Sequence, residues 1–200
     1  MRAAHATAVQ IVRPRRPSAS PRPRLARGRT SETRNVTIRA ATVADSDVIH
    51  ALISGHQAEG RLLPRSREEI AVRASRFVVA VRGGRIVACA DLAPLSRSVA
   101  EVRSLVVSDG VRSGGIGRRI VEDVARRASA AGFETLCAFT HAAGYFVHLG
   151  FSIVPHVWLP EKIDADCRSC AQFRTCGQYA VMLPLGRTRQ ACVPLTSLHG

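Results

Sequence analysis

The sequence contains no long hydrophobic run. Its apolar residues fall in short stretches, none of them long enough for a signal sequence or for a helix that spans a membrane. Lysine is almost missing too, since Lys162 is the single lysine among 29 basic residues. We therefore expect a cytoplasmic protein without a membrane partner, whose positive charge is carried by arginine.

Acidic residues are scarce at the beginning of the chain. Residues 1–35 contain nine arginines against one acidic residue, Glu32, and have almost no hydrophobic periodicity. Such a segment cannot bury enough apolar surface to fold, so we expect a disordered extension. Three interpretations of it stay open: a transit peptide, a basic arm that binds nucleic acid, or a solvated segment without a task.

The net charge of the remaining chain is modest. Nine arginines and one glutamate give the extension +8 of the formal +14, which leaves +6 for the other 165 residues. A mildly basic folded part suits anionic ligands and does not require nucleic acid, which is an unlikely partner on this evidence.

Six cysteines occur in a chain without a signal sequence, which favours a reducing setting. Three of them, Cys167, Cys170 and Cys176, have a spacing that zinc accepts, but a structural zinc site needs four ligands. His156 or Cys192 could be the fourth ligand, or there could be no fourth ligand. Zinc is therefore a possible ligand that we do not favour.

Hydrophobic periodicity predicts a single mixed α/β domain over residues 36–184, with a loose tail at 185–200. We expect seven strands, at residues 36–39, 77–81, 86–92, 100–107, 136–140, 151–154 and 179–183. We expect four helices, at residues 44–54, 66–74, from the glycine-rich loop to about 131, and at 143–149. Gly83 and Gly84 predict a tight hairpin turn between the second and third strands.

A glycine-rich turn joins the fourth strand to the third helix. Gly114, Gly115 and Gly117 lack a Cβ, so consecutive backbone N–H groups can approach an anion at the positive end of the helix dipole. No Gly-Lys-Ser/Thr follows and the dinucleotide pattern Gly-x-Gly-x-x-Gly is missing, which excludes both of those phosphate loops. A plain strand-to-helix turn without a ligand stays open as the alternative.

The remaining pattern, Arg112-x-x-Gly115-x-Gly117, resembles the pyrophosphate loop of the GNAT acetyltransferases. The stretch Tyr145 to Phe151 is similar to the last helix-to-strand signature of that family. The resemblance covers about residues 36–184 and implies the GNAT fold with acetyl-CoA as cosubstrate. The cofactor-binding residues that it implies are Leu105, Val106, Val107, Arg112, Ser113, Gly114, Gly115, Ile116, Gly117, Arg118 and Arg119.

The same resemblance implies catalytic residues. Glu101 matches the position at the start of the fourth strand where several GNAT enzymes keep a catalytic base. Arg103 points to the same face of a regular strand and can keep that carboxylate ionised. Backbone N–H groups of Leu105 to Val107 inherit the role of stabilising the oxyanion. Many family members have a tyrosine as proton donor where this chain has Phe146, so the neighbouring Tyr145 is the candidate acid.

A narrower resemblance concerns the acceptor. The stretches 60–66, 101–107 and 159–170 look like those of the short, kinase-free N-acetylglutamate synthases, although Gly177-Gln178 stands where an acidic residue is usual. This implies acetyl transfer to L-glutamate, with the two substrate carboxylates bound by cations. The implied substrate-binding residues are Leu63, Arg65, Arg103, Ser104 and Lys162.

Two alternatives stay open. The first is a GNAT enzyme for another amine, such as a polyamine, an aminoglycoside or a protein N-terminus. The second is a non-catalytic module that binds acyl-CoA and presents its basic arm to nucleic acid. A homodimer is compatible with either.

Overall fold

The structure is a computed structural model, and it describes residues 35–186 except 58–61, 63, 113 and 172. The predictions for the first 34 residues and for residues 187–200 lie outside the described part of the chain. The same holds for Leu63 and Ser113, which were assigned to the substrate and to the cofactor, and for Cys192, which could complete a zinc site that we do not favour.

Seven strands form one mixed sheet in the order β1-β2-β3-β4-β5-β7-β6. Neighbouring strands are antiparallel except for the central pair of β4 and β5, which is parallel. The strands are β1 Val36–Ala40, β2 Phe77–Arg82, β3 Arg85–Pro94, β4 Val99–Val107, β5 Thr135–Thr140, β6 Ser152–Val154 and β7 Tyr179–Pro184. The predicted mixed sheet of seven strands is confirmed.

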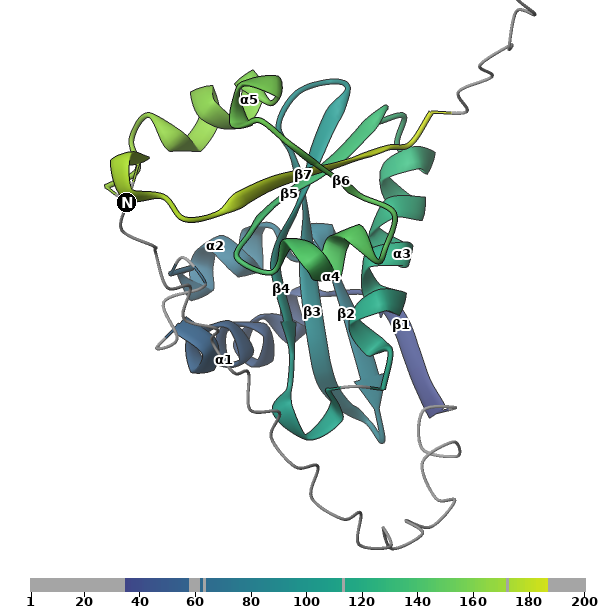
Figure 1. The fold of residues 1–200 in the computed structure, drawn as a ribbon. Coiled ribbons are helices and arrows are strands. Elements are labelled where there is room, and N and C mark those ends of the chain that lie inside the picture. Colours follow the sequence, from purple (N-terminus) through teal and green to yellow (C-terminus); the bar gives the residue numbers. More distant parts are fainter. Residues whose placement is uncertain (1–34, 58–61, 63, 113, 172, 187–200) are drawn as a thin grey trace, which may run out of the picture.

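Helices cover both faces of the sheet (Figure 1). On one face α1 (Ser46–Gln57) and α2 (Arg67–Val72) pack over a core that contains Ile49, Ile53 and Ile70. On the other face α3 (Ile116–Ala130) and α4 (Ala143–Val147) pack over the larger core. Among the described residues, no helix combines the length and apolar composition needed to cross a membrane.

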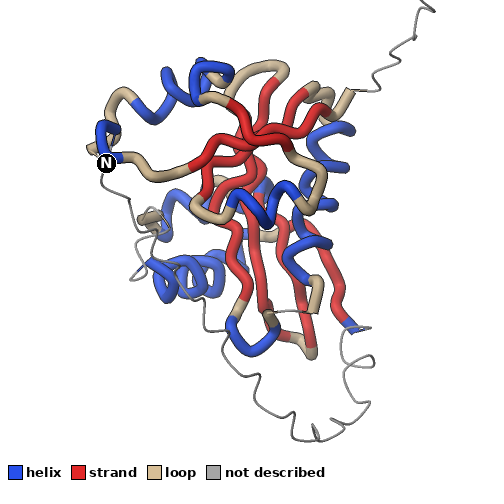
Figure 2. The backbone as a smooth tube through the Cα atoms, viewed as in Figure 1, coloured by secondary structure: helices blue, strands red, loops and turns tan. Residues whose placement is uncertain are grey.

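Short helical turns fill several connections (Figure 2). The 3-10 turns are Val43–Asp45, Ala74–Arg76, Asp109–Val111, His156–Trp158 and Phe173–Thr175. The segment expected to be irregular before the last strand begins with a short helix, α5 (Pro160–Lys162), which continues directly into a π-helix at Ile163–Cys167. The prediction of four helices therefore missed this one.

Local sequence chemistry explains the best-predicted connections. Gly83 and Gly84 both have positive φ angles, 55° and 75°, as a tight hairpin turn between two twisted strands requires. At the start of α2, the Ser66 hydroxyl accepts a hydrogen bond from the backbone N–H of Glu69. Along α3, Ile116, Ile120, Val121 and Val124 are all buried on the face toward the sheet, as their spacing predicts.

The sheet opens at its centre. β4 pairs with β5 only over Val99 to Glu101, so the rest of β4 has no ladder partner on that side. The register between β3 and β4 shifts at the same level, and Ser104 there has a φ of 49°, which is rare for a residue other than glycine. β4 and β5 therefore diverge beyond Glu101 and leave room for a cavity between them.

Candidate active site

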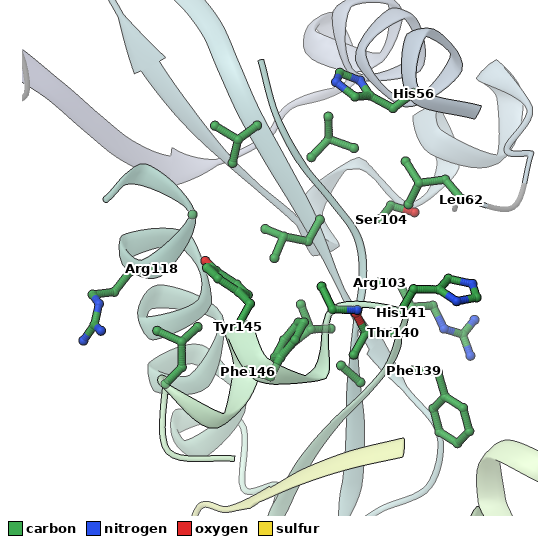
Figure 3. Close-up of a pocket in the computed structure, with 18 of the residues that line it drawn as sticks. His56, Leu62, Arg103, Ser104, Arg118, Phe139, Thr140, His141, Tyr145 and Phe146 are labelled. Carbon is green, nitrogen blue, oxygen red and sulfur yellow. The ribbon is translucent and has the colours of Figure 1, made fainter. Parts of the chain in front are cut away.

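A cavity of about 870 Å³ lies at the point where the sheet opens. Its walls come from β4, β5, α4, the start of α3 and the Lys162 region. Figure 3 shows that Tyr145 and Phe146 lie on one side of the view and Arg103, Phe139 and His141 on the other. We call these two sides the two ends of the cavity.

The first end is formed by the glycine-rich turn. Gly115 is the N-cap of α3 and has a φ of 73°, a left-handed conformation that glycine adopts without strain. Gly115, Ile116, Gly117 and Arg118 line the cavity, so the positive end of a 15-residue helix faces it. This end can bind a phosphate group.

Arginine side chains surround this turn, but they are not equivalent. Arg112 and Arg118 line the cavity, and Arg112 also pairs with Asp109 at 2.8 Å between Nη1 and Oδ1. Arg118 is exposed and its guanidinium points outward in the view of Figure 3. Arg119 does not line the cavity, because its Nη2 donates to the carbonyl of Val36 at 2.8 Å.

Tyr145 reaches this end of the cavity. Its hydroxyl lies 2.6 Å from the place where a Cβ on Gly117 would stand, so the absence of that Cβ makes the close approach possible. The rings of Tyr145 and Phe146 meet edge to face with centroids 5.4 Å apart. Both side chains line the cavity, although neighbouring residues of a regular helix point in directions about 100° apart. Burial raises the pKa of the Tyr145 hydroxyl.

The middle of the cavity is the unpaired edge of β4. Leu105, Val106 and Val107 line it, and Ser104 does so from the shifted stretch of the strand. β5 does not pair with this part of β4, so the sheet does not use the backbone groups that point to that edge; among them, the Val107 carbonyl accepts from Arg112 Nε at 3.2 Å. A bound chain with amide groups, such as a pantetheine arm, can complete the ladder there.

The second end holds ionised side chains that are far apart in the sequence. Glu101 is 3% exposed and lines the cavity. Its Oε2 accepts from Arg103 Nε at 2.5 Å, and its Oε1 lies 2.8 Å from Lys162 Nζ. The predicted shared face of Glu101 and Arg103 is therefore found, and Glu101 is a buried, paired carboxylate rather than a surface charge.

Asp166 belongs to the same group of charges. It pairs with Arg103 and, at 2.8 Å, with Lys162 Nζ. Burial acts to raise the pKa of Asp166, but the hydrogen bond from Lys162 and the charges of Lys162 and Arg103 outweigh it and lower that pKa. We call Glu101, Arg103, Lys162 and Asp166 the charge ring.

Arg65 lines the cavity beside the charge ring, and its guanidinium pairs with Glu69. Below it lies Asp91, which is 2% exposed. Asp91 stands opposite Arg103 in the β3–β4 register. The second end of the cavity therefore contains three lining cations, Arg65, Arg103 and Lys162, and each of them has a carboxylate partner.

The cysteine cluster is separate from the cavity lining. Cys167, Cys170 and Cys176 are free thiols, and burial raises the pKa of Cys167, which disfavours the thiolate that zinc would bind. Among the described residues, no three His, Cys, Asp or Glu side chains gather closely enough to hold a metal ion.

Several lining residues were not identified from the sequence. Phe139 carries Lys162 over its ring, with Nζ 5.3 Å from the centroid, and His141 lines the cavity close by. Asp166 lies outside the lining but pairs with two of its cations, and it was missed because its segment was read as irregular. The spacing of four between Lys162 and Asp166 is the one signal that could have revealed this helical pair.

Acetyl-CoA fits the donor groups that the cavity presents. A helix N-terminus with a glycine turn and two arginines suits a diphosphate, and an unpaired strand edge suits the amides of its pantetheine arm. The gap left by Gly117 brings the Tyr145 hydroxyl between this turn and the rest of the cavity.

Comparisons with known proteins agree with this reading of the site. Residues 73–153 match the family described as "Acetyltransferase (GNAT) domain". An uncharacterised N-acetyltransferase of Chlorobaculum tepidum is 32% identical over 148 residues, which cover 74% of this chain and 96% of that protein. An amino-acid acetyltransferase of Pseudomonas putida is 37% identical over 58% of this chain, but the match spans only 27% of that longer protein.

Among solved structures, N-acetylglutamate synthase from Neisseria gonorrhoeae, complexed with coenzyme A and N-acetyl-glutamate, superposes with a TM-score of 0.69. The sequence identity is 30%, and the match covers 76% of this chain and 35% of that one. The predicted fold, enzyme class and cosubstrate are confirmed by these relatives together with the Chlorobaculum protein. The chain belongs to the GNAT family of acetyl-CoA-dependent N-acetyltransferases.

Proposed function

We propose that this enzyme transfers the acetyl group of acetyl-CoA to the α-amino group of L-glutamate. The observation that carries the proposal is the grouping of Arg65, Arg103 and Lys162 at the end of the cavity away from the glycine turn. Glutamate brings two carboxylates, and planar guanidinium groups bind carboxylates with two parallel hydrogen bonds. The printed names of the amino-acid acetyltransferase and N-acetylglutamate synthase relatives support the same acceptor class.

The α-amino group of an amino acid is protonated at neutral pH and must lose a proton before it can attack a carbonyl carbon. Glu101 is the one carboxylate among the described residues that line the cavity. We assign it the role of base, acting through a water molecule, because its oxygens already accept from Arg103 and Lys162. Those contacts also fix its orientation toward the acceptor.

Bound acetyl-CoA supplies the thioester that is cleaved. Among the backbone N–H groups of Leu105 to Val107, those that point to the open edge of β4 can donate to the thioester oxygen. The Tyr145 hydroxyl keeps its proton at neutral pH as tyrosine ordinarily does, and burial raises its pKa further, so we assign it the role of passing a proton to the departing thiolate. Arg112, Gly115 and Gly117 hold the diphosphate and so fix how far the thioester lies from Glu101.

A substrate panel tests the acceptor. Release of free thiol from acetyl-CoA should be fastest with L-glutamate, slower with L-aspartate and slowest with spermidine, because the cations at this end select a carboxylate. Glutamine separates the contribution of the side-chain carboxylate from that of the α-carboxylate. Preference for spermidine or an aminoglycoside would refute the glutamate assignment while leaving acetyl transfer intact.

Substitution of the two catalytic candidates tests the mechanism. Glu101→Gln should lower kcat by roughly 100-fold or more, and Tyr145→Phe by roughly 10-fold or more, because each removes a proton-transfer group. Acetyl-CoA binding, measured by calorimetry, should change little in either variant. A Tyr145→Phe enzyme with the wild-type kcat would show that another group protonates the thiolate.

A further inference from the structure

The charge ring is closed by two carboxylates that share the same two cations. Oδ2 of Asp166 accepts from both Arg103 Nη2 and Lys162 Nζ, the latter at 2.8 Å. On the other side, Glu101 accepts from Arg103 Nε at 2.5 Å and from Lys162 Nζ at 2.9 Å. Arg103 and Lys162 are thereby brought together, although 59 positions separate them in the sequence.

The two carboxylates differ in position. Glu101 lines the cavity together with Arg103 and Lys162, whereas Asp166 reaches those cations from outside the lining. The side chain of Glu101 is 4% exposed and that of Asp166 is 36% exposed. Asp166 therefore does not contact the cavity's contents, and any effect that it has on an acceptor must pass through Arg103 and Lys162.

The backbone fixes Asp166 in this place. Lys162 is the last residue of α5 and Asp166 lies in the π-helix that follows, so four residues separate them on one continuous helical segment. Side chains at this spacing lie on the same side of a helix. Extra turns of the π type are enriched at functional sites, where they redirect a side chain.

The electrostatic reason for a second carboxylate is simple. Two cations held close together repel each other. Holding two long side chains in one rotamer each also costs conformational entropy. One buried carboxylate can pair with both, but a second one on the opposite side compensates the remaining charge and restricts both side chains.

We propose that Asp166 is a positioning residue for the acceptor: it holds Arg103 and Lys162 side by side at the cavity wall, where the two cations bind an acceptor carboxylate. The inference rests on the proposed acetyl transfer to a carboxylate-bearing amino acid and adds to it a residue that does not touch the substrate. Without Asp166 the cations remain, but their arrangement is lost.

Asp166→Asn tests this role, since it removes the charge and keeps the shape. We expect the KM for L-glutamate to rise roughly three- to tenfold, a range that allows for the partial exposure of the pair. The KM for acetyl-CoA should stay within about twofold of the wild type, because the phosphate loop is not touched. The kcat should fall less than the KM for L-glutamate rises, since Arg103 and Lys162 also orient Glu101. Asp166→Glu keeps the charge and should recover at least half of the lost affinity.

Asp164→Asn is the matched control. Asp164 lies in the same π-helix and pairs at 2.8 Å with Arg168, and both of these side chains are exposed. Its removal should leave the KM for L-glutamate unchanged. An unchanged or lower KM in Asp166→Asn overturns the positioning role, and so does an equal rise in the control or a failure of Asp166→Glu to recover affinity.

The outcome separates the two proposals. If the wild type acetylates glutamate and Asp166→Asn keeps the wild-type KM, the positioning role fails and the proposed function stands. If the wild type does not acetylate glutamate, the proposed function fails, and calorimetry with glutarate in the presence of coenzyme A tests the positioning role. Weaker glutarate binding to Asp166→Asn than to Asp164→Asn supports that role, and equal binding overturns it.

Discussion

Asp91 shows how a single side chain can be held in an unfavourable state below a functional site. Its carboxylate is 2% exposed, and within the described part of the chain Oδ1 accepts no hydrogen bond. Arg76 Nε lies 3.2 Å from this oxygen but donates to the carbonyl of Leu92 instead. Burial raises the pKa of Asp91, and the charges of Arg76 and the neighbouring arginines offset this only in part.

This raised pKa predicts a pH dependence of stability. A carboxyl whose folded pKa exceeds its unfolded value stabilises the fold at pH values below the unfolded pKa, and this contribution is lost as pH rises through the folded pKa. The free energy of unfolding of the wild type, measured relative to Asp91→Asn, should therefore fall from acidic to neutral pH. Urea denaturation from pH 4 to pH 7.5 measures it.

The control for this prediction is Asp164→Asn, whose carboxylate is 62% exposed. The difference in free energy of unfolding between Asp164→Asn and the wild type should not change over the same pH range, because an exposed ion pair contributes little to stability. A wild-type curve that rises relative to Asp91→Asn toward neutral pH would mean that Asp91 is stabilised as an anion by its arginines.

At the scale of single residues, the sequence predicted neighbours along a strand better than partners across the fold. The shared face of Glu101 and Arg103 followed from the alternation of side chains in a strand. Lys162 pairs with Glu101 across 61 positions, and Asp91 lies below the site; neither contact leaves a local pattern. Tyr145 was the candidate acid although a regular helix would turn it away from the position of Phe146, and in the five-residue α4 its hydroxyl lies beside Gly117.

At the scale of elements, α3 and α4 meet through one close approach. A Cβ on Gly117 would stand 2.6 Å from the Tyr145 hydroxyl oxygen and 3.4 Å from Cγ2 of Val107. The φ angle of Gly117 is not in the left-handed region, so alanine is allowed there by the backbone. Steric contact with Tyr145 is thus the main obstacle to a side chain at this position.

Gly117→Ala should therefore act through Tyr145. We expect the variant to push the hydroxyl away and to lower kcat by roughly tenfold, the size expected for loss of a positioned acid. In a Tyr145→Phe background, where the hydroxyl is absent, Gly117→Ala should have less than about a twofold further effect on kcat, whatever it does to the KM for acetyl-CoA through the phosphate loop. Steady-state kinetics of the two single variants and the double variant form the cycle that measures this coupling.

Gly115→Ala serves as a contrast, because Gly115 has a φ of 73° and no neighbour within 4 Å of the added Cβ. It should cost stability through backbone strain, about 1 kcal/mol, and should not depend on Tyr145. Additive effects of Gly117→Ala and Tyr145→Phe on kcat would contradict the proposed contact.

The elements themselves were predicted unevenly, and the reasons are physical. The hairpin at Gly83-Gly84 and the buried face of α3 rest on local rules, and both are found. The bend at Ser104 was not predicted, since serine gives no signal for a positive φ and tertiary packing must impose it. The segment 160–167 lacked a clear apolar period, so its helical pairing of Lys162 and Asp166 was missed.

At the scale of the whole molecule, the fold places its function where the sheet is incomplete. β1 to β4 form one continuous antiparallel ladder, and β5 to β7 form another, but the two halves join only through Val99 to Glu101. The glycine turn and the charge ring lie at opposite ends of the cavity in the gap between these halves. A ligand that completes the ladder along β4 therefore connects the two halves of the molecule.

This arrangement predicts a specific pattern of amide hydrogen exchange. β5 does not pair with Leu105 to Val107, so those of their amides that point to this edge should exchange quickly in the absence of ligand and several-fold more slowly with acetyl-CoA. Phe77 to Arg82 in β2 are paired on both sides by β1 and β3, and their exchange should not change. Mass spectrometry of the peptides that cover these two strands measures both.

Glutamate added alone should leave the β4 peptide unprotected, because the acceptor binds at the charge ring and not along the strand. Equal protection of β2 and β4 would instead mean that acetyl-CoA stabilises the whole sheet without completing the edge of β4.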